Sequence, residues 1–440
     1  MTHPPPRRTR TLAVSALARV EGEGALTIRT RRGRVVGAEL RIYEAPRLFE
    51  ALLRGRDAAD APDVTARICG ICPVAYQMSA VAAVEQAFGV FVAPAAAMLR
   101  RLLYCGEWIA SHALHVHFLH APDFLGHDGA LAMAQASPEL AAVVRRGLRL
   151  KQAGSAIMTL VGGRDVHPVS PCVGGFHAVP RVAAVRALRD PLRRALDDAV
   201  ATVAWAAGLD IPDVAVAHEW MALRHPDEYP ICSGRLATTG GLDAPVEAFL
   251  DHVEEVQVPW STALHARRRG RDVVHATGPL ARWNLNAAVA TPRAREAAAA
   301  AHLPVPCTNP ALGIVVRAVE MVVALEEAVR LVETWEPPLA PAVGWTPRAG
   351  VGHAVTEAPR GLLYHRYVID DVGRIVEARI VPPTSQNQEA IEADLRQAAA
   401  GFVALPQDEA VLAAEKVIRH WDPCISCATH FLRLRVEEAR

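Results

Sequence analysis

Two pairs of cysteines, one near each end of the chain, are the residues best placed to do chemistry. Cys69 and Cys72 form the first pair and Cys424 and Cys427 the second, each with two residues between its members. This spacing lets two sulfurs converge on one ion from a turn or from the start of a helix. Four thiolates brought together hold a soft transition metal better than any other residue set in the sequence.

The spacing by itself leaves the occupant of such a site open. Tetrahedral zinc is commonly bound by four cysteines with these gaps, and a redox metal suits the same donors. A disulfide or a thiol relay is the third interpretation. A structural zinc usually closes a small local loop, whereas about 350 residues lie between these pairs and the chain is long enough for a large core. If the pairs share an ion, the chain between them is not divisible into independent domains.

The elements that must bring the pairs together are mostly helical. Residues 11–43 alternate in apolar and polar character between glycines, which predicts a small antiparallel sheet. Strands are predicted again at 361–369 and 374–381, joined as a hairpin. Elsewhere, Ala- and Leu-rich stretches with helical periodicity predict helices. They lie at about 74–89, 93–120, 136–160, 180–208 and 310–333, and after the second strand region at 387–403 and 407–421. We therefore expect one helix-dominated α+β unit over residues 11–430, after a disordered tail at 1–10.

The composition argues against several classes of function. The 440 residues carry no formal net charge, so a nucleic-acid groove or a contact with an anionic membrane surface is not expected. No apolar run reaches the ~18 residues of a membrane span, and the N-terminus lacks the apolar core of a signal peptide. Eight cysteines are few for this length, which fits a reducing cytoplasm. Four of them are scattered singly and are expected as small buried hydrophobes: Cys105, Cys172, Cys232 and Cys307.

The sequence around the cysteine pairs resembles the large subunit of nickel–iron hydrogenases over nearly the whole chain. Several stretches match in the family's order, which chance does not explain. The resemblance implies the family's long helical bundle with small peripheral antiparallel sheets, and cleavage or formation of hydrogen at a buried nickel–iron centre. The matching stretches are Arg19-Val-Glu-Gly22, residues 49–57, Arg67–Pro73, residues 162–168, 278–282, 357–361 and 382–387, and Asp422–His430.

The resemblance also implies how the metals are held. Cys72 and Cys427 would bridge nickel and iron, and Cys69 and Cys424 would be terminal ligands of nickel. In the family, iron also carries carbon monoxide and cyanide. No side chain supplies those ligands, so dedicated maturation proteins are implied.

A second site, for a hard ion, follows from the same resemblance. The family binds magnesium near its C-terminus with a glutamate, a histidine and a backbone carbonyl. These correspond here to Glu50, His430 and the carbonyl of Ile380. A single carboxylate with waters is a common way to hold this ion. Without the resemblance, Glu50 would be interpreted as a charge on the surface of a helix.

The resemblance assigns roles around the nickel–iron centre. Heterolytic cleavage releases a proton that needs a nearby base, and Glu21 holds the position of the family's relay glutamate. Its local sequence alone would favour a surface carboxylate in a Gly-rich turn. Arg360 would point a fixed cation at the open metal position, although locally it could be a surface arginine after a proline. Thr384 would donate to a cyanide, and Pro359 and Pro383 would shape the apolar wall.

Two positions depart from the commoner family pattern. Tyr76 stands where many members have a histidine four residues after the second cysteine, and Glu23 replaces another histidine. Tyr76 can donate a hydrogen bond to a thiolate but does not shuttle protons near neutral pH. The chain is most similar to the cytoplasmic hydrogenases linked to NADP or a similar soluble carrier.

Other conspicuous residues are given structural roles. His112, His115, His117 and His120 are expected as core or interface histidines of one helix and not as metal ligands. His167 is expected in a turn near the buried site. Residues 431–440 correspond to a tail that a protease removes in many family members after nickel insertion; the alternative is a terminal strand.

Electrons need a route away from a buried metal, and the chain has no spare cysteine set for an iron–sulfur cluster. The resemblance therefore implies a small subunit that carries such clusters, with further diaphorase-type subunits that bind flavin and nicotinamide. No Gly-x-Gly-x-x-Gly follows a predicted strand, so the carrier is not expected to bind this chain. The alternatives are a hydrogen sensor, a scaffold of the related respiratory-complex type, which lacks the cysteine pairs, and a zinc-stapled scaffold.

Overall fold

The computed structural model describes residues 9–32 and 34–429. The expected tail at residues 1–8, His430 and the tail at 431–440 lie outside the described residues. The first strand begins at Thr9, so two residues of the segment expected to be a tail belong to a sheet. That sheet consists of β1 (Thr9–Val14), β2 (Gly24–Arg31) and β3 (Arg34–Ile42), paired antiparallel in chain order, as the alternation predicted.

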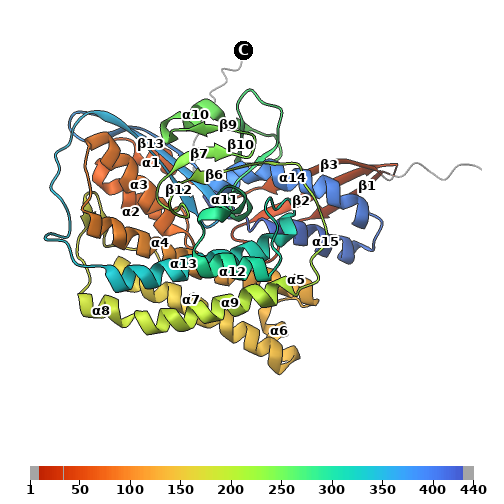
Figure 1. Ribbon diagram of the computed structural model, residues 1–440. Helices are drawn as coiled ribbons and strands as arrows, with labels where there is room; N and C mark the ends of the chain where they lie inside the picture. Colours follow the sequence, from red (N-terminus) through yellow and green to blue (C-terminus); the bar gives the residue numbers. More distant parts are fainter. Residues whose placement is uncertain (1–8, 33, 430–440) are drawn as a thin grey trace, which may run out of the picture.

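Four long helices form the central bundle: α4 (Pro94–Leu114), α7 (Pro138–Gly162), α9 (Arg189–Ala207) and α13 (Gly313–Thr334), which run alongside one another in Figure 1. Glycines permit the closest approach, between α4 and α7. A Cβ at Gly154 would lie 2.4 Å from the carbonyl oxygen of Gly106, so a side chain there would push the helices apart. α13 is buried on nearly all sides, which its run of valines and leucines explains.

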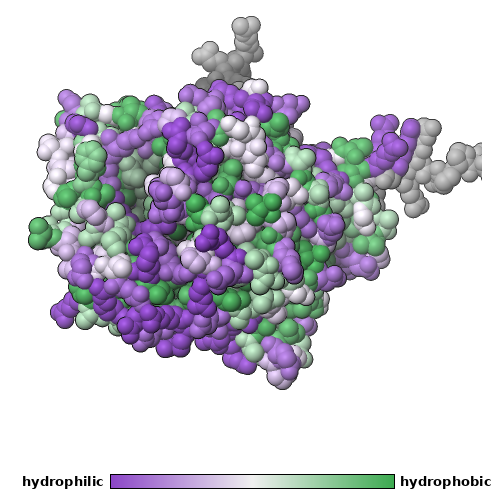
Figure 2. All heavy atoms as spheres, viewed as in Figure 1, coloured by the Kyte–Doolittle hydropathy of each residue, from purple (hydrophilic) through white to green (hydrophobic). Residues whose placement is uncertain are grey.

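The outer helices are amphipathic. In α9 the buried residues recur at helical spacing, from Leu192 through Leu196 and Val203, while arginines and aspartates occupy the other face. Figure 2 shows the result as a hydrophilic band along the lower edge, over α8 (Val182–Ala187) and α9. The two helices, predicted as one at 180–208, are separate because Pro191 lacks the amide that would bond the carbonyl four residues earlier.

Strands flank the bundle at its upper side (Figure 1). β12 (Gly350–Ala358), β13 (Gly361–Ile369) and β14 (Ile375–Val381) form an antiparallel sheet that contains the predicted hairpin. A four-stranded sheet has the order β11-β6-β7-β8: β6 (Glu219–Arg224), β7 (Arg235–Thr238), β8 (Asp243–Ala244) and, parallel to β6, β11 (His275–Ala276). Two short hairpins complete the strands: β4 (Pro171–Cys172) with β5 (Gly175–Phe176), and β9 (Val253–Gln257) with β10 (Leu264–Arg268).

The fold is the helix-dominated α+β class that the sequence predicted, and the predicted helices are confirmed to within a few residues. The stretch 93–120 is α4 continued by a π-helical turn, His115–His120. No element was predicted between 208 and 310, where short strands lack a clear period. The remaining helices are α1 (Phe49–Leu53), α2 (Ala61–Ala66), α3 (Pro73–Phe88), α5 (Ala121–Leu125), α6 (Ala130–Ala136), α10 (Phe249–His252), α11 (Pro279–Asn286), α12 (Pro292–Ala300), α14 (Pro383–Phe402) and α15 (Gln407–His420).

One large cluster of buried apolar residues extends from Leu12 to Cys427 and includes all four cysteines of the two pairs. The two ends of the chain therefore share a core with the helical bundle between them. Among the helices of residues 9–32 and 34–429, none combines the length and apolar character that a membrane crossing requires.

Candidate metal centre

The four paired cysteines meet in the core as the sequence predicted. Their sulfurs all lie within 4.8 Å of one another, and each side chain is almost completely buried. The sulfur of Cys69 is 3.3 Å from that of Cys424, and Cys72 is 3.5 Å from Cys427 across the same site. Within the described ranges, no other group of histidines, cysteines and carboxylates converges in this way. The donors are those of a soft-metal site.

The first pair is held by the start of α3. Cys72 is the N-cap of this helix and Pro73 its first residue, a position where the missing amide costs nothing. Glu107 of α4 caps the helix from outside, since its carboxylate accepts the amides of Val74 at 2.6 Å and Ala75 at 3.1 Å. The amide of Ile71 in turn donates to the sulfur of Cys69 at 3.4 Å. The geometry of this pair thus depends on a contact between two helices.

The second pair is held by the N-terminal segment and by α14. The backbone of Glu21 pairs with that of Cys424 in a parallel bridge, and the amide of Ile425 donates to the carbonyl of Glu21 at 3.0 Å. The hydroxyl of Thr384, in the first turn of α14, accepts the amide of Cys424 at 3.1 Å. Two chain segments, distant from this pair in the sequence, therefore fix it.

Burial dominates the ionisation of the four thiols. It raises the pKa of Cys72, Cys424 and Cys427 above that of an ordinary thiol. Burial also opposes ionisation of Cys69, but hydrogen bonds from the other sulfurs and the positive charge of Arg360 outweigh it and lower its pKa. Burial thus opposes ionisation at all four sulfurs. A bound cation is what would let all four ionise.

Glu21 lies against the cysteine cluster. Its Oε2 atom accepts from the sulfur of Cys424 at 3.0 Å and from the amide of Ser426 at 3.1 Å. Burial raises the pKa of the Glu21 carboxyl, and the negative charge of Cys69 adds to this, while the hydrogen bonds from Cys424 and Ser426 oppose it. A half-buried carboxyl with a raised pKa, in contact with a thiol, suits the acceptance and release of protons.

Arg360 is buried and faces the cluster from the turn between β12 and β13. Its Nε donates to the carbonyl of Asp422 at 2.7 Å, and its guanidinium forms an ion pair with the Asp422 carboxylate at 2.9 Å that lacks hydrogen-bond alignment. It also donates to the hydroxyl of Ser111 at 3.3 Å. Burial opposes its charge, but Asp422 and the sulfurs of Cys424 and Cys72 outweigh this and raise its pKa, so the cation persists.

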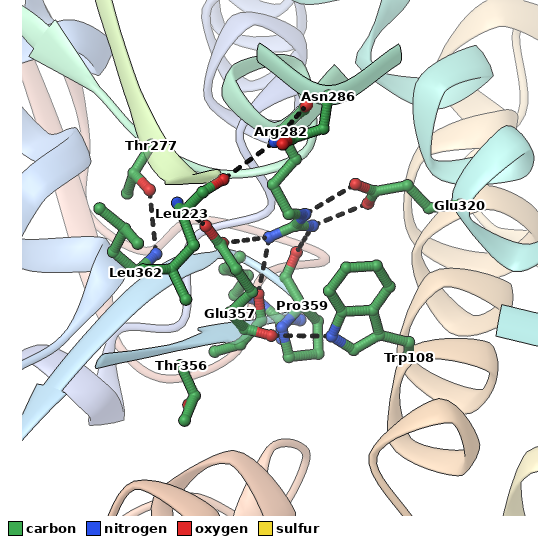
Figure 3. Close-up of polar contacts among 12 residues, drawn as sticks. Trp108, Leu223, Thr277, Arg282, Asn286, Glu320, Thr356, Glu357, Pro359 and Leu362 are labelled. Atoms are coloured by element: carbon green, nitrogen blue, oxygen red, sulfur yellow. Dashed lines mark hydrogen bonds and ion pairs between the residues drawn. The ribbon is translucent and has the colours of Figure 1, made fainter. Parts of the chain in front are cut away.

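A buried network positions the turn that carries Arg360, as Figure 3 shows. Arg282 of α11 donates to both oxygens of Glu320 at 2.7 Å and to Glu357 at 3.0 Å. The same guanidinium donates to the carbonyls of Ala358 and Pro359, each at 2.9 Å, and its carbon lies 4.3 Å from the centre of the Trp108 ring. Arg282 therefore fixes the two peptide units that immediately precede Arg360.

The other residues predicted around the cluster are also buried there. Pro359 and Pro383 precede Arg360 and Thr384, and Thr384 keeps its own hydroxyl proton free to donate. The hydroxyl of Tyr76 has no hydrogen-bond partner among the described residues, and the charges of Cys427 and Cys72 add to burial in raising its pKa. The Tyr76 hydroxyl makes no hydrogen bond to a sulfur among the described residues, so the donor role that the sequence suggested stays a prediction.

The predicted hard-ion site is brought together in part. Glu50, buried in α1, accepts the amide of Ile380 at 2.8 Å through its Oε1 atom, so the structure places these two residues side by side. The contact is made through the amide and not through the carbonyl that was predicted as a ligand. The residue before His430, Thr429, is buried and accepts the amide of Arg47 at 2.6 Å, three residues from Glu50. His430 itself lies outside the described residues.

The histidines of the α4 region are buried and bonded to the protein. His112 lies 3.0 Å from Glu320, and His115 lies 2.8 Å from the carbonyl of Arg419. His167 adopts a left-handed backbone conformation in the turn after α7 and bonds the carbonyl of Ala66, close to the first cysteine pair. Of the scattered cysteines, Cys105 and Cys307 are buried and Cys172 and Cys232 are half-buried.

Sequence reasoning missed several residues at the site. Asp422 and Arg282 lie inside matched stretches but were given no role. No local sequence pattern marks Glu107 or Glu44, because each forms hydrogen bonds with a segment distant in sequence. Glu107 accepts an amide at the start of α3, and Glu44 accepts the hydroxyl of Ser426. The charged and polar partners of a buried cluster come from elements that only the packing of the chain brings together.

Known proteins provide an independent comparison. The family model described as nickel-dependent hydrogenase matches residues 47–147 and 274–430, which include both cysteine pairs. The chain is 31% identical over 429 residues to the alpha subunit of sulfhydrogenase 1 of Pyrococcus furiosus, a match that covers 96% of this chain and 98% of that protein. It is 28% identical over 486 residues to the beta subunit of the NAD-reducing hydrogenase HoxS of Cupriavidus necator, covering 96% and 95%.

The fold agrees with these similarities. It matches the structure of an NAD+-reducing [NiFe]-hydrogenase in the H2-reduced state with a TM-score of 0.86 and 27% identity, covering 96% of this chain and 100% of the other.

Proposed function

This chain belongs to the nickel-dependent hydrogenase family, and from that premise we propose how its residues catalyse the reversible cleavage of hydrogen into protons and electrons. The observation that carries the proposal is the meeting of four buried sulfurs within 4.8 Å, with the Glu21 carboxylate 3.0 Å from one of them. When bound, a nickel–iron centre supplies the soft, electron-rich metal pair that splits hydrogen heterolytically and takes up its electrons. The donor set fits such a centre, because four thiolates suit soft metals and burial excludes water.

In this proposal Cys72 and Cys427 would hold both metals, and Cys69 and Cys424 would complete the nickel site. The fit is supported by the buried, unpartnered hydroxyl of Tyr76 and by the cation of Arg360, whose charge the sulfurs stabilise. These groups stabilise negative charge on a thiolate cluster in a region from which water is excluded.

Glu21 acts as the base that receives the proton. Its contact with the Cys424 sulfur gives it direct access to a proton held there, and its raised pKa favours transient protonation. Arg360 has an electrostatic role. Its guanidinium is locked by Asp422 and by the peptide units that Arg282 holds, so it presents a preorganised positive charge at no further cost during the reaction.

Carbon monoxide and cyanide on the iron, and the maturation proteins that install them, belong to the same proposal. The Thr384 hydroxyl supports it, since this group accepts from Cys424 and retains a proton to donate. Pro359 and Pro383, buried next to Arg360 and Thr384, are proposed to form the apolar wall of the site. Removal of residues 431–440 after metal insertion is part of this maturation step.

Magnesium is proposed at the second site, with Glu50, His430 and a backbone carbonyl at or next to Ile380 as ligands. The support is the buried carboxylate of Glu50 beside the Ile380 backbone. A bound cation offsets the cost of burying a carboxylate charge, and magnesium commonly binds through one carboxylate and waters.

Electrons leave through a partner subunit that carries iron–sulfur clusters, because the described part of this chain offers no second metal-binding cluster. We place its docking face near Gly70, which is exposed although it adjoins the buried Cys69. A cavity of about 930 Å³ opens on this side, between Arg67, Gln77 and Arg164. Val169 is half exposed at its rim and offers apolar surface to a partner. Arg67 pairs there with Asp63 and not with a cysteine.

The relatives support the choice of carrier. The similarity to an NAD-reducing hydrogenase favours a complex with diaphorase-type subunits that bind flavin and nicotinamide, located in the cytoplasm.

Metal analysis of the protein from a host supplied with nickel, with an assay of hydrogen-dependent reduction of a viologen dye, tests the proposal. Equimolar nickel and iron with dye reduction is the expected result. Zinc without nickel would overturn it. Nickel and iron with hydrogen binding but negligible turnover would favour a sensor.

A further inference from the structure

Arg317 of α13 is a buried cation to which the described part of the chain supplies no ion-pair partner. The residue is 2% exposed, and its guanidinium has one hydrogen-bond acceptor among the described residues, the carbonyl oxygen of His420 at 3.0 Å. The Nε atom is buried and has no partner there. The other buried arginines that the structure describes each pair with a carboxylate: Arg100 with Glu85, Arg268 with Glu219, Arg282 with Glu320, Arg360 with Asp422 and Arg419 with Asp123.

The guanidinium keeps its charge in this position. Burial lowers the pKa of Arg317 to about 10, so the group stays protonated at neutral pH. The negative charges of Asp422 and Glu320 act to raise this pKa. Each of these carboxylates already has its own arginine, Arg360 or Arg282, and those positive charges act to lower the pKa again. A buried charge without its own partner destabilises the fold, so this position favours a counter-ion from outside the chain.

A small cavity borders this guanidinium. Its volume is about 10 Å³, which is the room that one water-sized guest needs. Arg317, Leu280 and His420 are among the residues that line it. A Cβ added at Gly313, the first residue of α13, would lie 2.9 Å from Nη1 of Arg317, 3.2 Å from Cδ1 of Leu280 and 3.3 Å from the carbonyl oxygen of His420. Glycine at position 313 therefore leaves space for the guanidinium at the wall of the cavity.

The lining has the chemistry of an anion site. Its described residues include the cation of Arg317 and no carboxylate. His420 adds a buried imidazole whose Nε2 atom has no partner among the described residues. Burial lowers the pKa of His420, so the ring is neutral near pH 7 and can present an N–H to an anion. The stacked rings of Trp220 and Trp421, with centres 6.1 Å apart, contribute apolar wall.

We propose that this cavity binds one monoatomic anion of the halide class, such as chloride, as the counter-ion of Arg317. Sulfate, phosphate and carboxylates are too large for a volume of about 10 Å³, and a water molecule would fill the cavity without offsetting the charge. Chloride and bromide are favoured over fluoride, because fluoride is more strongly hydrated and loses more on burial. Since Arg317 also donates to the carbonyl of His420, the bound anion stabilises the contact between α13 and the end of α15.

Thermal unfolding of the full chain at constant ionic strength tests the site. Sodium gluconate, whose anion is too large for the cavity, is replaced stepwise by chloride, bromide or fluoride at pH 7. Chloride and bromide should raise the melting temperature in a saturable way, by about 1–3 °C at ten times the dissociation constant, and fluoride should act more weakly. Arg317→Met removes the cation and should abolish this dependence. Arg293→Met removes an exposed arginine, changes the net charge equally and should retain the dependence.

Crystals of the unmodified protein grown in bromide give a second measurement, which needs no folded variant. An anomalous peak within hydrogen-bonding distance of the Arg317 guanidinium is the expected result. An empty cavity or density for a water alone overturns the proposal, as does a melting temperature that ignores chloride or responds equally in Arg317→Met. Neither measurement depends on nickel or on turnover, so the hydrogenase function is tested separately.

Discussion

Arg282 donates a hydrogen bond to the backbone carbonyl of Pro359 at 2.9 Å, although 77 positions separate them in the sequence. The position of Arg360 is therefore coupled to a fully buried ion network, in which Arg282, Glu320 and Glu357 have no side-chain exposure. Burial opposes the charge of the Arg282 guanidinium, but Glu320 and Glu357 outweigh it and raise its pKa; burial likewise opposes the charge of Glu320, and Arg282 in return lowers the pKa of that carboxyl.

Replacement of this cation should strongly destabilise the fold. Arg282→Met leaves two buried carboxylates without their partner, so the free energy of unfolding should fall by about 3–5 kcal/mol. Arg282→Lys keeps the charge but loses the planar fork that reaches both carboxylates and both carbonyls, and should give an intermediate loss. Urea unfolding of the two variants measures the difference. Arg293→Met, which removes an exposed pair with Asp197, should change stability by less than about 0.5 kcal/mol.

Removal of the ionisable group at Glu21 should separate proton transfer from metal binding. Glu21→Gln keeps a side chain of the same shape beside Cys424, so nickel content should match that of the unmodified enzyme. Exchange of hydrogen with D2O should fall by about two orders of magnitude or more, because the amide cannot act as a base. Full turnover in a nickel-loaded Glu21→Gln enzyme would show that another group is the base.

Stability should depend on pH through Glu392 of α14. Burial raises the pKa of this carboxyl to about 7, against the hydrogen bonds from the Leu40 amide and the Trp260 indole and the charge of Arg396, while Glu39 adds to the rise. The folded state then holds a proton that the unfolded chain, with a carboxyl pKa near 4.5, has released.

The free energy of unfolding should therefore decrease as pH rises from about 4.5 to 7, by an amount on the order of 2–3 kcal/mol. Glu392→Gln retains the acceptor oxygen and should remove this contribution, so the variant should gain stability relative to the unmodified protein at pH 8 and not at pH 4. Urea midpoints across the pH range measure it. An identical pH slope in the two proteins would contradict the assignment.

Metal binding should stabilise the folded state, because the site joins segments from the two ends of the chain. The four sulfurs join the start of α3 to the segment after α15, and an ion that binds only the folded state raises its stability by mass action. Protein from a host supplied with nickel should therefore melt at a higher temperature than protein from a nickel-depleted host. Cys427→Ala should remove this difference. Cys307→Ala, at a buried cysteine outside the cluster, should preserve it.

The contact between α4 and α7 should tolerate no larger residue at Gly154. An added Cβ would meet the Gly106 carbonyl at 2.4 Å and the Ala110 amide at 2.7 Å, both backbone atoms that move only if the helices separate. Gly154→Ala should destabilise by about 1–3 kcal/mol. Gly401→Ala is the control, since this exposed residue of α14 has open space around it and should gain up to about 1 kcal/mol from helix propensity. Thermal unfolding distinguishes the two.

Much of this protein follows from local sequence. The long helices carry apolar residues at helical spacing, and the three N-terminal strands alternate, so their type and approximate bounds are set by which faces can be buried. These helices are α3, α4, α7, α8 with α9, α13, α14 and α15. The region from 208 to 310 was not predictable in this way, because strands of two to six residues have too few positions to display a period. The spacing of the cysteines by itself indicates a metal site or a redox-active thiol pair and leaves the occupant open, because it depends on donor type and local geometry alone.

What the sequence determined by itself is the set of donors: two Cys-x-x-Cys pairs and the matched stretches around them name the chemistry and the family. What only the tertiary structure decided is which charged groups share that site. Glu21 touches Cys424 across 403 positions, and Glu107 caps the helix that starts at Cys72. Such contacts depend on how helices and loops pack over the whole chain, whereas local propensity and periodicity act over only a few turns. The raised pKa of Glu21 and the fixed cation of Arg360 are therefore properties of the folded core.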